Sequence, residues 1–413
     1  MKKARVVITG IGVVAPNGGC LSEFWDNVLT CKSGIGTISL FKHPDFPVRY
    51  AGEVKKFRLS KYTDGRFKPL RLSRHAQFAL ATTKMAIDHA GVTPELLREY
   101  DPFPIVIGIS TSAMEVIERN EDVLVSKGPL RVSPFGVGAC QPHAAACAIA
   151  DFLGVRTQRI TLSSACSAGL DAVAYCAGLV ASGRADIALA GGADAPITPL
   201  SMASFARAGL ASDFDMPPER SSRPFDLYRK GGLISEGAGV VVLESLDHAV
   251  RRGAFPWLEI LGYGNTADDS GAETGSGLRH SMTEALANAG LLPGDIDYIN
   301  AHGPSHPVID RVETAMIKDV FGRHAGRMPV SSIKGVTGNP LAASGPLQIA
   351  ACAMAMRSQR IPPTANYEIA DPLCDLDYVP LQPYVMSSHR AIINMHGLGG
   401  GNSSLVVGKV DSA

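Results

Sequence analysis

Short runs of β-branched and other apolar residues alternate along the chain with longer stretches rich in alanine and leucine. In the N-terminal part, the runs that predict buried strands are 6–14, 104–110, 159–164, 186–194 and 239–245. The stretches that predict helices between them are 72–91, 138–153 and 167–183. Continuous apolar strands with helical connections are typical of a sheet that helices cover on both faces. The pattern therefore predicts an α/β fold.

The same pattern starts again in the C-terminal part of the chain. Predicted helices lie near 279–290 and 343–357, and predicted strands fall within 257–267, 295–303, 329–338 and 391–409. The segments 7–12 and 260–264 both run from a strand into a Gly-x-Gly turn. This echo predicts two similar α/β halves, residues 1–250 and 251–413. We expect them to pack as one unit, because the segment that joins them looks helical.

Composition limits the binding partners and the cellular compartment that we expect for the protein. The 413 residues are 46% hydrophobic and 19% charged, as in an ordinary globular protein. Lys and Arg together number 39, and so do Asp and Glu, so the formal charge of zero argues against nucleic acid as the main partner. No apolar stretch approaches the ~20 residues that a membrane span requires. The eight cysteines include no CxxC pair, which predicts reduced thiols and a cytoplasmic location.

One cysteine lies where a nucleophile would be expected. A predicted strand ends at Ser164, and a helix begins near Cys166. The free N–H groups and the dipole at the start of that helix would favour a thiolate and could hold a developing oxyanion. The alternative is that Cys166 is one more small buried residue, like Cys147 and Cys176. Local chemistry leaves both interpretations open.

Three further segments carry candidate chemistry just after predicted strands. His302 follows one strand, and Lys334 and Asn339 follow another. In open α/β sheets, ligands gather at the carboxyl ends of strands. The glycine-rich segment 396–402 could bring backbone N–H groups close to a ligand. Each has a plain alternative: a core histidine, a surface lysine, an ordinary turn.

Taken together and in this order, Cys166, His302, Lys334 and the loop 396–402 resemble the β-ketoacyl-acyl-carrier-protein (ACP) synthases of type II fatty-acid and polyketide synthesis. The resemblance covers nearly the whole chain and includes 6–18, 133–135, 222–226, 236–239 and 361–366. It implies a thiolase fold, in which two α/β halves form a five-layered α-β-α-β-α structure. It also implies an acyltransferase whose only prosthetic group is the phosphopantetheine that ACP carries, with no cofactor of its own.

The family's reaction is a ping-pong Claisen condensation. The resemblance implies that Cys166 accepts an acyl chain from ACP and that malonyl-ACP then loses carbon dioxide and attacks the thioester. His302 would stabilise the enolate or orient the malonyl thioester, and Lys334 would support His302 electrostatically. The backbone amides of Cys166 and Leu398 would form the oxyanion hole. Family members are homodimers in which residues near 133–138 reach toward the partner's acyl pocket; a heterodimer with another ketosynthase-like subunit is the alternative.

The sequence departs from the family around this site. The family's second catalytic histidine is Asn339 here, which can donate a hydrogen bond to an enolate oxygen but cannot shuttle a proton. The threonines that contact the pantetheine arm are replaced by Pro304 and His306, and the gatekeeper aromatic by Leu398. A glutamate of the following helix is Gln348, and the threonine of the glycine loop is Gly401. We expect the substrate's pantetheine arm to lie near Pro304, His306, His396, Gly399 and Gly400.

A basic run suggests where ACP docks. Its members are Arg58, Lys61, Arg66, Lys68, Arg71 and Arg74. The resemblance implies docking of the acidic ACP on Arg66, Lys68 and Arg71; the alternative is a solvated surface.

Two other motifs suggest sites that their neighbouring residues do not support. His302, His306 and Asp310 have the four-residue spacing of metal ligands, but prolines at 304 and 307 oppose a continuous helix, so we expect no metal site. Asp310 and Glu313 are instead predicted to open the following helix. The Gly-x-Gly-x-x-Ala segment 10–15 fits a dinucleotide fingerprint on paper, but a loop follows where a helix is required, so we expect no NAD.

Two rival functions remain. One is an acyltransferase or thioesterase-like enzyme that acylates Cys166 but does not decarboxylate malonyl groups. The other is a non-catalytic partner that resembles chain-length factors. The presence of Cys166, His302 and Lys334 counts against the second.

Overall fold

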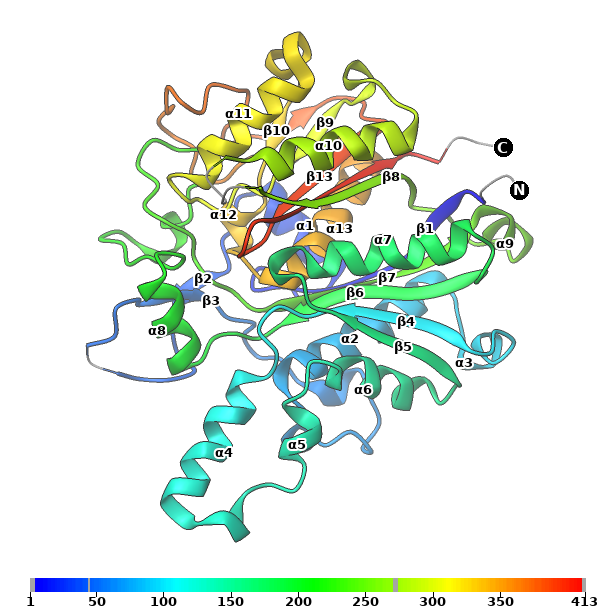
Figure 1. Ribbon diagram of the computed structural model, residues 1–413, viewed down its shortest axis with the longest axis vertical. Coiled ribbons are helices and arrows are strands. Elements are labelled where there is room, and N and C mark those ends of the chain that lie inside the picture. Colours follow the sequence, from blue (N-terminus) through cyan, green and yellow to red (C-terminus); the bar gives the residue numbers. More distant parts are fainter. Residues whose placement is uncertain (1–3, 44, 270–273, 411–413) are drawn as a thin grey trace.

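A ten-stranded mixed sheet runs through the computed structural model, which describes residues 4–43, 45–269 and 274–410 (Figure 1). The strand order is β10-β9-β13-β14-β8-β1-β7-β6-β4-β5. In chain order the strands are β1 Val6–Val14, β4 Phe103–Gly108, β5 Thr157–Leu162, β6 Ile187–Asp194, β7 Gly237–Ser245, β8 Leu258–Ala267, β9 Tyr298–Asn300, β10 Val330–Ser331, β13 Arg390–His396 and β14 Gly401–Gly408.

The sheet has two wings. Strands that precede residue 246 form one wing, and strands that follow residue 257 form the other. They meet where β1 pairs with β8 in antiparallel fashion, Val6 opposite Ile260. The division into two units near residue 250 stays a prediction, since this pairing makes the sheet continuous.

Helices cover both wings and fill the space between them (Figure 1). The outer helices of the first wing are α2 Arg74–Ala90 and α6 Ala144–Leu153. Those between the wings are α7 Ala168–Ala181 and α13 Ser344–Ser358, and those outside the second wing are α10 Ser276–Ala289 and α11 Ile309–Phe321. The predicted five-layered α-β-α-β-α thiolase fold is confirmed.

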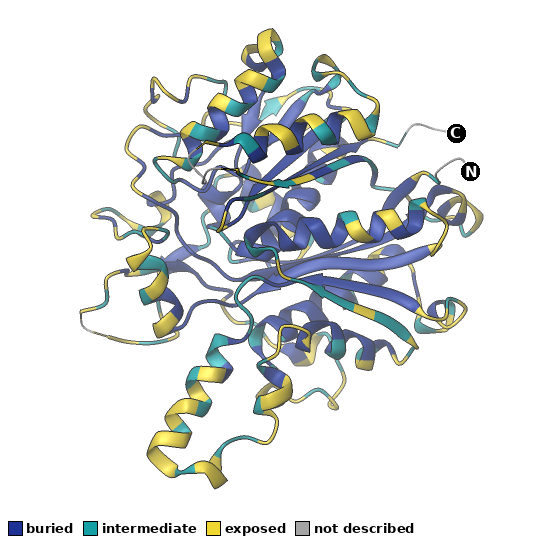
Figure 2. Ribbon diagram, in the orientation of Figure 1, coloured by how far each residue is buried: buried dark blue, intermediate teal, exposed yellow. Residues whose placement is uncertain are grey.

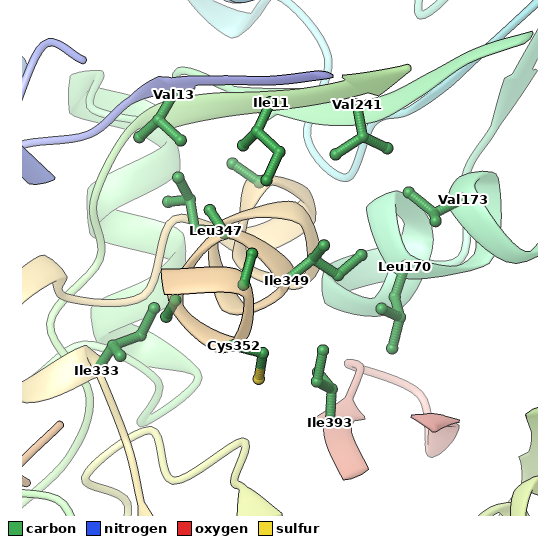
Figure 3. Packing of buried hydrophobic residues seen from close by; sticks show 14 of the residues in the cluster. Ile11, Val13, Leu170, Val173, Val241, Ile333, Leu347, Ile349, Cys352 and Ile393 are labelled. Atoms are coloured by element: carbon green, nitrogen blue, oxygen red, sulfur yellow. The ribbon is translucent and has the colours of Figure 1, made fainter. Parts of the chain in front are cut away.

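The middle layer is the core on which the functional segments rest. Figure 3 shows side chains from β1, β7, α7, α13 and β13 converging between the wings, among them Ile11, Val241, Leu170, Val173, Leu347, Ile349, Cys352 and Ile393. All are buried. Removal of so much apolar surface from water fixes α7 and α13 relative to both wings.

The two Gly-x-Gly turns serve packing. A Cβ atom at Gly12 would lie 1.9 Å from the backbone oxygen of Thr82 on α2. A Cβ atom at Gly264 would lie 2.2 Å from that of Ser281 on α10. Only glycine permits these helices to lie so close to β1 and β8. The faint sequence echo therefore marks the same helix-on-strand contact in each wing.

Three predicted elements differ from the structure. The stretch 138–153 is not one helix: α5 Gly136–Ala139 and α6 are separated around Pro142, whose ring removes a backbone donor. The strand predicted within 329–338 covers only two residues and is followed by the short helix α12 Lys334–Thr337. The segment 391–409 is a hairpin of two strands.

An arm projects from the body of the molecule (Figures 1 and 2). It runs from α4 Met114–Lys127 to α5 and exposes apolar side chains, including Val125, Leu130 and Val137. The remaining elements are α1 Leu21–Leu29, β2 Ile35–Thr37, β3 Tyr50–Gly52, α3 Pro94–Leu97, α8 Pro199–Arg207, α9 Leu246–Arg251, β11 Arg360–Ile361 and β12 Tyr384–Val385, besides single 3-10 turns. Within the described ranges, no helix is long and apolar enough to cross a membrane.

Candidate active site

Cys166 lies at a sharp turn from strand to helix. β5 ends at Leu162, and the turn Ala165–Ser167 leads directly into α7. Ala165 has a φ of 55°, a left-handed conformation that costs a non-glycine residue free energy. The strained residue directly precedes Cys166, whose side chain is buried. The sequence predicted the position of the cysteine but not the strain beside it.

The resting state of this cysteine is a thiol. Burial, and to a smaller extent the nearby carboxylate of Asp194, raise the pKa of Cys166 to about 11. Lys334, the backbone N–H of Leu398 and the side chain of Asn339 act in the opposite direction, the last two by hydrogen bonds to the sulfur. The expected thiolate is therefore wrong for the free protein, because desolvation outweighs these contacts.

His302 follows β9 in a buried loop that a carboxylate holds. Its backbone N–H donates to Glu313 at 2.8 Å, and the N–H of Gly303 donates to the other carboxylate oxygen, also at 2.8 Å. Burial, with the charge of Lys334, lowers the pKa of His302 well below the usual histidine value. Its Nδ1 atom has no hydrogen-bond partner among the residues that the structure describes. His302 is thus a neutral imidazole.

Lys334 opens α12 and is fully buried. Its Nζ atom donates to the backbone oxygen of His302 at 2.6 Å, and this hydrogen bond holds the loop that carries His302. Burial lowers the pKa of Lys334 to about 8, against the attraction of Glu313, Cys166 and Asp310. The lysine therefore still carries its charge at pH 7, and this charge acts on both His302 and Cys166.

Asn339 is held with its amide group toward the sulfur of Cys166. Its backbone N–H donates to Leu233 at 2.7 Å, and its Oδ1 atom accepts from Ser344 at 3.2 Å. Its NH₂ group is thereby left to donate to Cys166. Gln348 lies deeper, where its Nε2 atom donates to backbone oxygens of residues 300 and 301 at 3.1 and 3.0 Å.

The glycine loop supplies a second hydrogen bond to the sulfur of Cys166, from the backbone N–H of Leu398. Gly399 and Gly400 have φ values of 89° and 82°, which glycine adopts at no steric cost. The side chain of Leu398 points outward, 67% exposed, while its backbone N–H faces Cys166. His396 is buried at the end of β13, with its ring centroid 6.1 Å from that of His302.

The neighbouring loop places Pro304 and His306 at the same end of the sheet. Pro304 is buried and His306 is half-buried. The Nδ1 atom of His306 accepts from the N–H groups of Val308 and Ile309 at 3.2 and 3.3 Å, and burial lowers the pKa of His306. His306 turns this nitrogen to the start of α11, away from any shared metal position. No group of three metal-ligating side chains occurs in the part of the chain that the structure describes.

The two acidic residues of α11 have different roles. Asp310 lies in the first turn, as predicted, and accepts from the N–H of Phe225 at 2.8 Å. The prediction that Glu313 merely opens the helix is wrong: its carboxylate is buried and holds the His302 loop. An acidic residue in a helix usually reads as a surface charge, so the sequence carried no signal for this contact.

The basic run divides into separate environments. Arg66 pairs with Asp64 at 2.8 Å, and Lys68 is exposed. The guanidinium of Arg71 lies over the ring of Phe135 at 4.5 Å. Arg74 instead forms a salt bridge at 2.6 Å with the buried Glu236.

Comparisons with known proteins agree over the whole chain. Residues 3–249 match the family "Beta-ketoacyl synthase, N-terminal domain", and residues 258–368 match "Beta-ketoacyl synthase, C-terminal domain". The chain is 37% identical to 3-oxoacyl-[acyl-carrier-protein] synthase 2 of Synechocystis, over 99% of each chain.

Two solved structures are similar in both fold and sequence. One is a type II polyketide synthase acyl carrier protein in complex with its ketosynthase bound to the hexaketide: TM-score 0.89, 32% identity, 99% of this chain and 100% of that chain. The other is the ishigamide ketosynthase/chain length factor: TM-score 0.92, 32% identity, with the same coverage.

Proposed function

The chain belongs to the β-ketoacyl synthase family, and from this premise we propose that it is a 3-oxoacyl-ACP synthase of fatty-acid or polyketide synthesis with a Cys-His-Asn site. The observation that carries the proposal is the convergence on one thiol. The side chain of Asn339, the backbone N–H of Leu398 and the charge of Lys334 all act on Cys166. Cys176, a buried cysteine of α7, has no such surroundings: burial alone shifts its pKa, upward.

The first half-reaction is acyl transfer. The sulfur of Cys166 attacks the thioester of acyl-ACP, and the carbonyl oxygen gains negative charge. The backbone N–H groups of Cys166 and Leu398 are the proposed oxyanion hole, since preorganised donors stabilise charge that develops in the transition state. The exposed side chain of Leu398 leaves room for the acyl chain to pass.

The second half-reaction is decarboxylative condensation with malonyl-ACP. Loss of carbon dioxide leaves an enolate oxygen that needs hydrogen-bond donors. The neutral imidazole of His302 and the NH₂ group of Asn339 are the proposed donors, and the nearby charge of Lys334 stabilises the anion. Neither donor needs to exchange a proton for this role. The reaction requires no group beyond the phosphopantetheine of ACP.

The partners follow from the surface. The proposed ACP contacts are Arg66, Lys68 and Arg71, which present positive charge to an acidic protein. The exposed apolar arm and the edge strand β5 suit a dimer, in which each would be covered. The solved ketosynthase/chain length factor makes a heterodimer the alternative to a homodimer. All eight cysteines are free, which supports a cytoplasmic location.

One rival function is favoured by a specific observation. Asn339 cannot carry a proton, so an acyltransferase that stops at acyl-Cys166 fits the same site. The test is to incubate the protein with acyl-ACP and malonyl-ACP and to weigh both proteins by intact mass spectrometry. A 3-ketoacyl-ACP product supports the synthase. Acylated protein with intact malonyl-ACP, across several chain lengths and ACPs, supports the acyltransferase.

Matched cysteine variants locate the acyl group. Cys166→Ala should abolish acylation, whereas Cys176→Ala, which removes a buried cysteine of α7, should leave it intact. Acylation of the Cys166→Ala protein would contradict the proposed nucleophile. A wild-type protein that no acyl-ACP acylates would favour the non-catalytic partner.

A further inference from the structure

Acylation of Cys166 releases the proton of its thiol, and another group must accept that proton. At pH 7 the buried thiol is protonated, because burial raises the pKa of Cys166 to about 11. The thiolate is the nucleophile, so the proton must leave as the carbon–sulfur bond forms. The leaving thiol of the carrier must then receive one. A group that takes and returns a single proton would serve both steps.

The two polar side chains proposed for the enolate do not suit this task. Asn339 has no basic atom, since its NH₂ group donates and its Oδ1 atom is only a hydrogen-bond acceptor. Burial, together with the charge of Lys334, lowers the pKa of His302 well below the usual value. His302 is therefore a weak base. A third side chain with a free basic nitrogen would suit the task better.

His396 has the geometry of a base. Its Nδ1 atom lies 2.7 Å from Oδ1 of Asn402, directly across the β13–β14 hairpin. The orientation of that amide is fixed, because Nδ2 of Asn402 donates to the backbone oxygen of Gly400 at 2.9 Å. Oδ1 can only accept, so Nδ1 of His396 carries the hydrogen. Nε2 is then left with a free lone pair.

The chain directly after His396 borders the nucleophile. Gly397 packs against the turn before Cys166: a Cβ atom added to Gly397 would lie 3.1 Å from the backbone oxygen of Ser164. One residue further, the N–H of Leu398 bonds to the sulfur of Cys166. The ring centroid of His396 lies 6.1 Å from that of His302. His396 is therefore next to His302 and to the segment that bonds to Cys166.

We propose that His396, oriented by Asn402, is the catalytic residue that carries the proton during acyl transfer to Cys166. The inference rests on the proposed synthase or acyltransferase function and deepens it. A nucleophile, a base and a group that orients the base form the usual arrangement of covalent catalysis.

The proton accounting closes in two steps. As the sulfur of Cys166 bonds to the acyl carbon, its proton passes to Nε2 of His396, directly or through one water molecule. The oxyanion then collapses, the bond from the acyl carbon to the carrier sulfur breaks, and His396 returns the proton to that sulfur. No oxidant, metal or further reactant takes part.

The test measures acylation alone, without malonyl-ACP. Wild-type protein is mixed with an acyl-ACP that acylates it, quenched at short times and weighed. His396→Phe should acylate at least about a hundredfold more slowly, within the range that general acid–base catalysis contributes. His389→Phe, which removes an exposed histidine, should acylate at the wild-type rate. Added imidazole should speed the His396→Ala variant, because a free base can occupy the space.

The outcomes separate the two proposals. If the wild type is not acylated, the proposed function fails; if the wild type and His396→Phe are acylated at the same rate, only the role of His396 fails. A slow His396→Ala that imidazole does not rescue would assign His396 a structural role and overturn the inference. Should the variants not fold, acylation of the wild type in D₂O decides: slowing supports proton transfer, and an unchanged rate overturns it.

Discussion

The substitution Glu313→Gln removes a buried negative charge and exchanges only one heavy atom, yet it should destabilise the protein strongly. In Glu313→Gln, one carboxylate oxygen becomes an NH₂ group, so either His302 or Gly303 faces a donor with its own N–H. A hydrogen bond to a charged group is worth about 1.5–3 kcal/mol, and a buried N–H without a partner costs about 1–3 kcal/mol. Lys334 also loses the carboxylate that attracts it most. We expect the free energy of unfolding to fall by about 3–5 kcal/mol, as when a buried charge loses its partner.

The assay is urea unfolding followed by circular dichroism at pH 7 and one protein concentration. The matched control is Asp319→Asn on the same helix, which removes an exposed partner of Arg279 and should cost less than about 1 kcal/mol. In a double-mutant cycle with Lys334→Met, the loss of unfolding free energy in the double variant should differ from the sum of the two single losses by about 0.5–3 kcal/mol. A loss below 1 kcal/mol for Glu313→Gln, or additive losses, would refute the reasoning.

Two further predictions concern α7 and the turn that leads into it. Alkylation of Cys166 by iodoacetamide should rise about tenfold per pH unit from pH 7 to 10, because its pKa of about 11 leaves the thiolate fraction proportional to hydroxide over that range; a plateau below pH 9 would contradict the burial argument. Gly169→Ala should lower the free energy of unfolding by at least about 2 kcal/mol, since its Cβ would lie 2.0 Å from the backbone oxygen of Ala342. Gly178→Ala on the same helix has nothing within 4 Å and should instead raise it by about 0.5–1 kcal/mol.

Much of the fold was predictable because it depends on regular patterns. β1 matches its predicted bounds, 6–14, since nine consecutive apolar or small residues are fully buried in the structure. The short strands β9 and β10 were over-extended in the prediction. The polar residues that follow these strands leave the sheet and form the site. There the loop after β9 hydrogen-bonds to the carboxylate of Glu313 and the amine of Lys334, and not to a neighbouring strand.

The candidate site was predictable only as far as its motifs. Cys166, His302, Lys334 and Asn339 were singled out from the sequence, and the structure places them together. The left-handed Ala165 gave no signal, because alanine rarely adopts that conformation. The electrostatic balance at Cys166 was predicted with the wrong sign, because a sequence shows the helix start but not the depth of burial.

The replacement of a histidine by Asn339 has a consequence for the division of labour in the site. The condensation step needs hydrogen-bond donors at an anionic oxygen, and Asn339 and His302 supply them without changing protonation state. The acylation step needs a proton carrier, because a thiol of raised pKa does not ionise by itself. His396 supplies a free lone pair beside His302. A site so arranged keeps Cys166 unreactive until a thioester arrives, and it separates the two half-reactions onto different side chains, so that variants of Asn339 and of His396 should impair different steps.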